Sequence, residues 1–184
     1  MQEPERLSPL QPPGGEAVVL RLPDLVVEER PFTRKLSIRG RPHEATFVTA
    51  FQQAFGVEPP RPGMTKEIAS VTILWSGPTE WLVVHPPSID ESRTERVIIG
   101  GLLSVDVSSA TTTLRLSGAG VHWTLRKVSA LPFAGMPNGT VARTRIGRLA
   151  ILAHAIKPAC LDLYVSRSFA RSFFEQLRDA AEMS

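Results

Sequence analysis

The residue types that most often carry out chemistry are few and scattered in this chain. His154 and Cys160 lie six positions apart across a Lys-Pro turn, so we expect them to be near each other. Two such side chains do not make a metal site, and no second histidine or cysteine stands at a metal-ligand spacing. Cys160 begins an apolar strand, where a free cysteine usually packs as a small hydrophobe. Both residues are therefore expected in the core. The histidines are His43, His85, His122 and His154.

An acid and a glycine-rich turn are the next candidates. Asp106 stands inside the strong strand pattern of residues 105–108. No second carboxylate has a fixed spacing from it for acid–base work, so a bond to a backbone N–H or an arginine is its favoured role. Residues 117–120 (SGAG) could open an anion-binding helix, but they lack the length and the lysine of a phosphate loop. We expect no catalytic, cofactor-binding or metal-binding residue in this chain.

Arginine supplies most of the positive charge, with 17 arginines against 4 lysines and a net charge of +3. Arginine is enriched at protein interfaces, where lysine is depleted, although a GC-rich genome gives the same bias. The densest group is Arg143, Arg145 and Arg148 around Gly147. In a strand Arg143 and Arg145 face the same way. Single-strand nucleic-acid readers pair such groups with exposed aromatics, so salt bridges within the protein or to a partner are favoured.

Trp123 is the aromatic residue with the strongest interface signal. On a helix from residue 119, the buried stripe is Val121, Leu125 and Val128. Trp123 falls on the other side of the helical wheel, either on the surface or under the loop at residues 131–133. Tryptophan is enriched among interface hot spots, so Trp123 is a predicted interface residue. The arginine group described above, Arg143, Arg145 and Arg148, supplies the other predicted interface residues.

The elements expected to position these residues form an α+β pattern. Strands are expected over residues 18–27, at an edge, and over 33–39, 69–75, 80–84, 104–108, 113–117, 140–146, 148–156 and 160–165. Helices are expected over residues 42–55, 91–101, 119–128 and 168–181. We predict two small subdomains of mixed or antiparallel sheet covered by helices, over residues 17–98 and 99–184, after a disordered tail over residues 1–16.

Composition sets the class of protein. The 184 residues have 42% hydrophobic content and a single cysteine, which suits a reducing compartment. The acidic, proline-rich start does not resemble a signal peptide, and no apolar run approaches the ~18 residues that span a bilayer. We therefore expect a cytoplasmic protein that binds neither membrane nor nucleic acid.

Four segments together resemble one family. They are residues 73–84 (ILWSGPTEWLVV), the pair 105–108 and 114–118, residues 143–147 (RTRIG) and residues 162–170 (DLYVSRSFA). In this order they are similar to the gamma subunit of heterotetrameric sarcosine oxidase, over roughly residues 70–182. Where that family often has Gly-Cys-Pro, residues 128–132 read VSALP, which leaves the amine substrate open.

The resemblance implies a fold like the first domain of the glycine-cleavage T-protein. It also implies a non-catalytic gamma subunit of an oxidoreductase complex that acts on N-methyl amines. Alpha, beta and delta subunits would be its partners, and FAD, FMN, NAD, tetrahydrofolate and zinc would be bound by those partners. Such a chain would brace the large subunits, and it would expose apolar surface and self-associate if isolated.

Two alternatives stay open. A stand-alone folate-binding or aminomethyltransferase-like domain is the first, although the T-protein folate pocket forms among three domains. An RNA-associated domain, suggested by arginine content alone, is the second.

Overall fold

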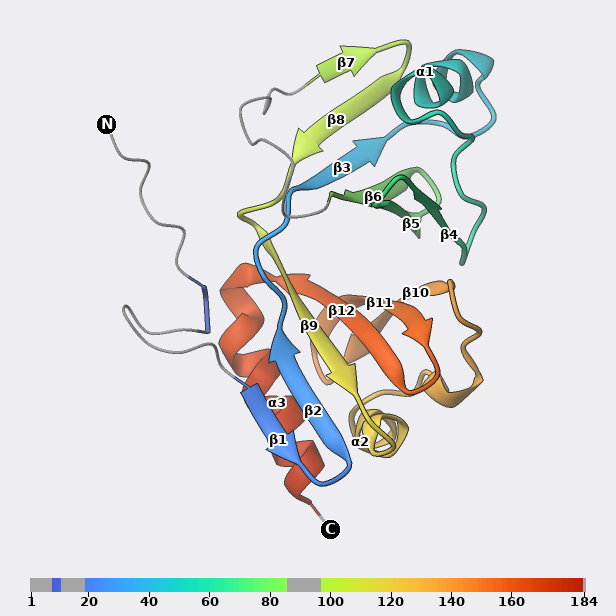
Figure 1. Cartoon of the computed structure of the whole chain (residues 1–184). Coiled ribbons are helices and arrows are strands. Elements are labelled where there is room, and N and C mark those ends of the chain that lie inside the picture. Colours follow the sequence, from blue (N-terminus) through green and yellow to red (C-terminus); the bar gives the residue numbers. More distant parts are fainter. Residues whose placement is uncertain (1–7, 11–18, 86–96, 184) are drawn as a thin grey trace, which may run out of the picture.

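The computed structural model describes residues 8–10, 19–85 and 97–183, which form two antiparallel sheets stacked one above the other (Figure 1). Sheet A consists of β1 (Val19–Leu22), β2 (Leu25–Glu29), β9 (Thr111–Ser117), β10 (Val141–Ile146), β11 (Leu149–Lys157) and β12 (Cys160–Ser166), in the order β1-β2-β9-β12-β11-β10. Sheet B consists of β3 (Lys35–Arg39), β4 (Thr65–Ile68), β5 (Val71–Gly77), β6 (Glu80–Val84), β7 (Val97–Ile99) and β8 (Leu102–Asp106), in the order β4-β5-β6-β3-β8-β7. The predicted α+β class is confirmed.

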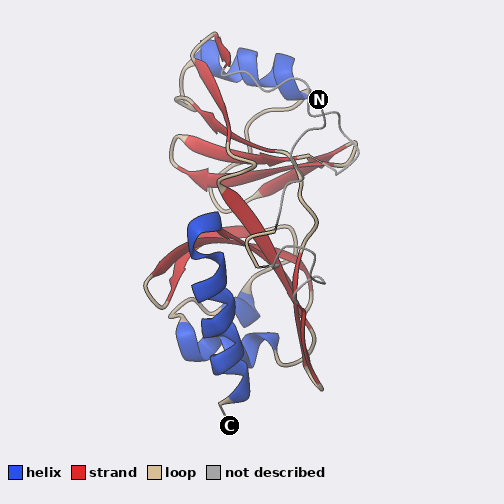
Figure 2. Cartoon of the chain, turned by 90° about the vertical axis from the view of Figure 1, so that its left-hand side faces the viewer, coloured by secondary structure: helices blue, strands red, loops and turns tan. Residues whose placement is uncertain are grey.

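Helices cover one face of each sheet (Figure 2). The helix α1 (Ala45–Phe55) packs on sheet B, and α2 (Val121–Val128) and α3 (Ala170–Glu182) pack on sheet A. Strand side chains alternate between faces, so each sheet offers one apolar face to its helices and its second face to the other sheet. Short 3₁₀ helices occupy Phe133–Gly135 and Arg167–Phe169.

Aromatic side chains on one side of α1 form the core between this helix and sheet B. Phe47 and Phe51 are fully buried, and Trp81 stacks on the Phe47 ring at 5.1 Å between ring centres. Gly56 ends the helix in a left-handed conformation (φ 75°), and its N–H donates to the carbonyl of Gln52 at 2.7 Å. Gly40 has to be glycine, because a Cβ there would lie 2.0 Å from the Phe47 ring.

The sheets do not divide at residue 98, where the sequence suggested a boundary. Strands β1 and β2 join the sheet of the second half, and β7 and β8 both join sheet B. Residues 35–106 are thus an insertion between β2 and β9, which pair in register from Val26↔Ser117 to Glu29↔Leu114. The expected tail at residues 1–16 lies outside the described residues except for 8–10, where Leu10 is buried in the sheet A core.

Three expected elements differ in the structure. The helix expected over residues 91–101 is wrong for its described part, because β7 and β8 form a hairpin whose turn is Gly100-Gly101. Both glycines have positive φ (56° and 81°), as a tight hairpin turn requires. The single strand expected over residues 18–27 is two strands joined by a turn at Pro23-Asp24, and only β1 is at the edge. Finally, β4 went unpredicted because its turn uses Ala69 and Ser70 at positive φ, without glycine or asparagine.

Candidate functional site

The two sheets face each other across a small apolar cluster. Leu74 and Leu82 of sheet B meet Val141, Leu152 and Tyr164 of sheet A, and all five are buried. Beside this cluster a cleft of about 280 Å³ opens between the sheets. The space between the sheets is therefore part core and part polar cleft.

Glu80 lies in this cleft and connects the two sheets. Its Oε1 accepts a hydrogen bond from Ser37 Oγ at 2.9 Å and lies 3.5 Å from Nη2 of Arg39. Its Oε2 lies 3.6 Å from Nη2 of Arg143, which also donates to Ser76 Oγ at 3.1 Å. The lining of the cleft contains no histidine, cysteine or lysine among the described residues. Its chemistry is that of an ion-pair network that holds two sheets together.

A row of polar side chains crosses sheet A on the face turned toward sheet B. In register, Glu28 lies opposite Arg115, Arg115 opposite Asp162, and Asp162 opposite His154. Arg115 binds the Asp162 carboxylate with two hydrogen bonds, Nε–Oδ1 at 2.7 Å and Nη2–Oδ2 at 2.8 Å. The hydrogen bond to Asp162 raises the pKa of the Arg115 guanidinium. This fork-shaped pair fixes the register of β9 against β12.

His154 continues that row into the buried interior. It is 2% exposed, and its Nδ1 has no hydrogen-bond partner among the described residues. Burial lowers the pKa of His154, and the charge of Arg115 adds to this, against the opposite effects of Asp162 and Glu67. His154 is thus held as a neutral core residue, as the sequence favoured. Burial also raises the pKa of the nearby Tyr164 hydroxyl, which stays protonated.

We predict that the free energy of unfolding falls as the pH drops below about 6.5, the ordinary histidine pKa. The pKa of His154 is lower in the folded chain than in the unfolded chain. Between these two pKa values, unfolding therefore takes up a proton. Each pH unit over which unfolding takes up one proton removes about 1.4 kcal/mol. Urea unfolding from pH 7 to pH 5 measures this slope. His154→Gln should reduce the slope without abolishing it, because burial also lowers the pKa of His85, and the exposed His43→Gln should leave it unchanged. Equal slopes in all three proteins would contradict the prediction.

Lys35 is a buried cation that no sequence pattern singled out. It is 2% exposed, and its Nζ donates to the carbonyl of Thr33 at 3.1 Å. Burial lowers the pKa of Lys35 to about 8, against the carboxylates of Glu29 and Asp106. Its Nζ also lies 5.7 Å from the centre of the Phe32 ring. The side chain sits where the chain passes from sheet A to sheet B.

Asp106 and Cys160 occupy the positions that the sequence favoured. Asp106 accepts a hydrogen bond from the backbone N–H of Ser108 at 2.8 Å and lies 3.9 Å from Nε of Arg34. Cys160 is 3% exposed at the start of β12. Among residues 8–10, 19–85 and 97–183 no group of three or more histidine, cysteine or acidic side chains could hold a metal ion.

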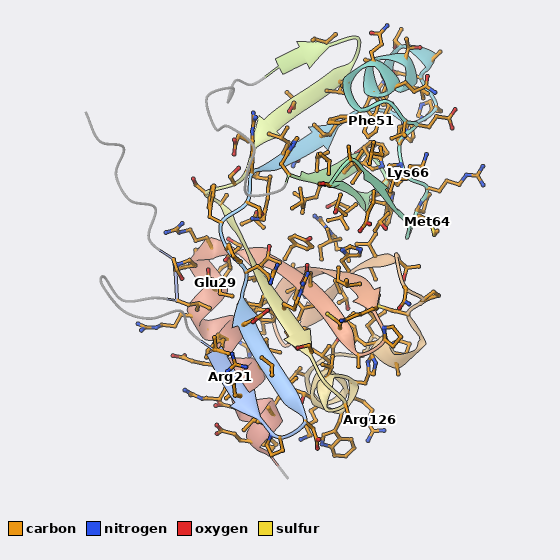
Figure 3. All side chains as sticks on the ribbon, viewed as in Figure 1. Arg21, Glu29, Phe51, Met64, Lys66 and Arg126 are labelled. Atoms are coloured by element: carbon orange, nitrogen blue, oxygen red, sulfur yellow. The ribbon has the colours of Figure 1, made fainter. Side chains whose placement is uncertain are left out.

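Trp123 lies on the surface of α2, on the opposite side from the buried Val121 and Leu125. It is 53% exposed, whereas Phe133 of the following loop is buried without it. The Arg126 guanidinium lies 4.6 Å from the centre of the Trp123 ring, and Lys127 Nζ lies 5.0 Å from it. Figure 3 shows Arg126 at the end of the molecule farthest from α1. An exposed tryptophan flanked by two cations is suited to contact an acidic or aromatic partner surface.

The three predicted interface arginines lie together along β10 and its turn. Arg143, Arg145 and Arg148 are all exposed. The Arg143 side chain also extends into the cleft, where it contacts Ser76 and Glu80 of sheet B. No sequence pattern predicted these two contacts. Trp123 lies on α2, and the end of α2 lines a groove with Arg143 and Arg145. The structure therefore brings the end of this helix and the basic strand to one side of sheet A.

Residues 39–183 match the model of the sarcosine oxidase gamma subunit family. The chain belongs to this family. The comparison with curated proteins gave no match. No helix in the described part of the chain is long and apolar enough to cross a membrane.

Solved structures share the fold of this gamma-subunit family member. A chain of the heterotetrameric sarcosine oxidase from Corynebacterium sp. U-96, in complex with pyrrole 2-carboxylate, is 20% identical with a TM-score of 0.71, over 85% of this chain and 83% of that one. The glycine cleavage system aminomethyltransferase T from Bartonella henselae is 10% identical with a TM-score of 0.57. That match covers 82% of this chain but 44% of the transferase chain, so this fold corresponds to about half of that protein. The predicted likeness to part of the T-protein is confirmed.

Proposed function

We propose that this chain is the gamma subunit of a cytoplasmic, heterotetrameric sarcosine oxidase, and that it braces the large subunits without catalysing a step itself. The observation that carries the proposal is the family match over residues 39–183. Alpha, beta and delta subunits would be its partners. FAD, FMN, NAD, tetrahydrofolate and zinc would be bound by those partners, and the complex would oxidise sarcosine or another N-methyl amine. The polar cleft supports a structural role, because its carboxylate, Glu80, lies between Arg39 of the same sheet and Arg143 of the other sheet.

Purification of the tagged chain from its native host tests this proposal. We expect larger subunits to co-elute in fixed ratio with the visible absorption of bound flavin. A colourless chain that elutes alone would overturn the proposal. In that case folate binding by the isolated chain, measured by calorimetry, would test the stand-alone alternative that the fold likeness to the aminomethyltransferase suggests. A steep salt dependence of RNA binding would instead support the RNA alternative.

Trp123→Ala is expected to weaken assembly with the large subunits at least about tenfold, because a central tryptophan is the commonest interface anchor. Titration of the purified large subunits with the variant, followed by analytical ultracentrifugation, measures the change. Phe169→Ala is the matched control, because Phe169 is a similarly exposed aromatic (51%) at the start of α3. Wild-type affinity for Trp123→Ala would exclude Trp123 as an anchor.

A further inference from the structure

Strand β10 is an edge of sheet A and bonds to β11 alone among the strands of that sheet (Figure 1). Two backbone hydrogen bonds frame its open side. The N–H of Val141 donates to the carbonyl of Gly63 at 2.9 Å, and the N–H of Gly147 donates to the carbonyl of Val128 at 2.8 Å. Residues 141 and 147 therefore direct their backbone groups away from β11.

Backbone groups along an antiparallel strand alternate between its two edges. Arg143 and Arg145 lie between those two framing residues with the same parity, so their N–H and C=O groups also point to the open edge. Neither N–H donates to a backbone carbonyl elsewhere in the described chain. Within the described chain, the open edge of β10 thus has one stretch without a backbone partner. It contains two outward-facing residues, Arg143 and Arg145, and is called the window below.

A groove of about 630 Å³ runs beside this window. It is lined by the end of α2 and the loop after it (residues 128–130) and by Arg143, Thr144, Arg145, Gly147 and Ala150. No acidic side chain lines it. Arg145 and Arg148 are exposed, and no salt bridge to either is found within the described residues. The window is therefore basic and presents the outward backbone groups of two residues to an extended peptide.

The occupant of this window follows from its charge. A second copy of β10 would place arginines against arginines across the new strand pair, which is destabilising. Charged residues on an edge strand also protect it from pairing with other strands, but lysine is the usual residue in that role. An extended segment with an acidic side chain beside Arg145 would pair with a guanidinium that has no ion-pair partner within the described residues, whereas Arg143 already lies 3.6 Å from Glu80.

We propose that an extended acidic segment of a large subunit adds to β10 as a seventh strand of sheet A, with an acidic side chain facing Arg145. The backbone groups of Arg143 and Arg145 supply the pairing, and the Arg145 guanidinium selects the charge of the partner. This inference rests on the proposed function, because it names the contact through which the chain would join its complex.

Hydrogen exchange by mass spectrometry, on the free chain and on the native complex, tests the inference without a variant. We expect peptides that cover residues 143–145 to exchange at least about tenfold more slowly in the complex. Unchanged exchange there in an intact complex would overturn strand addition while leaving the subunit role standing. If no complex is recovered, the proposed function itself has failed.

Two variants sharpen the test. Arg145→Pro removes one outward N–H at an edge position, where proline is tolerated, and should weaken assembly about tenfold while the thermal unfolding of the free chain changes little. Arg145→Glu should weaken assembly with a reduced salt dependence. Arg21→Glu is the matched control, because Arg21 is exposed on β1 at the opposite edge of sheet A (Figure 3). Equal loss of assembly in Arg145→Glu and Arg21→Glu would overturn the charge selection.

Discussion

Asp162→Ala is expected to lower the free energy of unfolding by about 3 kcal/mol, the lower end of what breaking a buried ion pair costs. The Asp162 side chain is 9% exposed and accepts both hydrogen bonds of the Arg115 fork. Its removal would leave the guanidinium without its partner in the middle of sheet A. Because the Arg115 side chain is 26% exposed, water can reach part of it and limit the loss. Urea unfolding followed by circular dichroism gives the change.

Two further variants test whether the loss of stability comes from the buried ion pair. Glu28→Ala removes a carboxylate from the same row, but the Glu28 side chain is 34% exposed and pairs with the half-buried Arg30, so we expect a loss below about 1 kcal/mol. Arg115→Met combined with Asp162→Leu removes both charges and should recover most of the stability. The explanation is wrong if Asp162→Ala unfolds within about 1 kcal/mol of the wild type.

Trp81→Ala is expected to cost about 3–5 kcal/mol, the usual loss when a buried tryptophan is truncated. Trp81 is 2% exposed, stacks on Phe47 and meets Phe51 edge-on at 5.8 Å between ring centres. Its Nε1 donates to the carbonyl of Pro60 at 3.0 Å, so the variant also leaves a buried acceptor without its donor. The lost ring packing and the lost hydrogen bond both destabilise the region between α1 and sheet B.

The same denaturant experiment measures this loss, and hydrogen exchange should show faster exchange in α1 than in α3. Trp123→Ala in the isolated chain provides the contrast, because an exposed side chain changes stability by about 0.5 kcal/mol or less. Similar losses for the two tryptophan variants would contradict the assignment of Trp81 to the core and Trp123 to the surface.

Local patterns predicted the parts of the molecule that depend on nearby residues. The exposure of Trp123 follows from its angle to Val121 on one helix, and the burial of Phe47 and Phe51 follows from helical spacing. Cys160 in the core follows from its apolar neighbours. Each of these depends on fewer than a dozen consecutive residues, which is the range over which sequence periodicity carries information.

Features that depend on register between distant strands escaped prediction. The Arg115–Asp162 fork exists because β9 lies beside β12, and the cleft exists because Glu80 and Arg143 come from different sheets. Nothing in the residues around any of these four reveals its partner. The helix expected at residues 91–101 failed for a different reason. A Gly-Gly pair such as residues 100–101 fits a hairpin turn as well as a helix end, and here the pairing of β7 with β8 makes it a turn.

The insertion of residues 35–106 between β2 and β9 also affects the order in which the chain can fold. Sheet B is built from one continuous stretch, so it can close as soon as that stretch has left the ribosome. Sheet A has to wait, because its central strand β12 lies near the C-terminus and β2 pairs with a strand far along the chain. Closing so long a loop costs entropy and slows folding. We therefore expect the edge at β10 to form late in synthesis. A chain truncated before β10 would keep a folded sheet B but would lack the strand to which we propose that a partner segment adds.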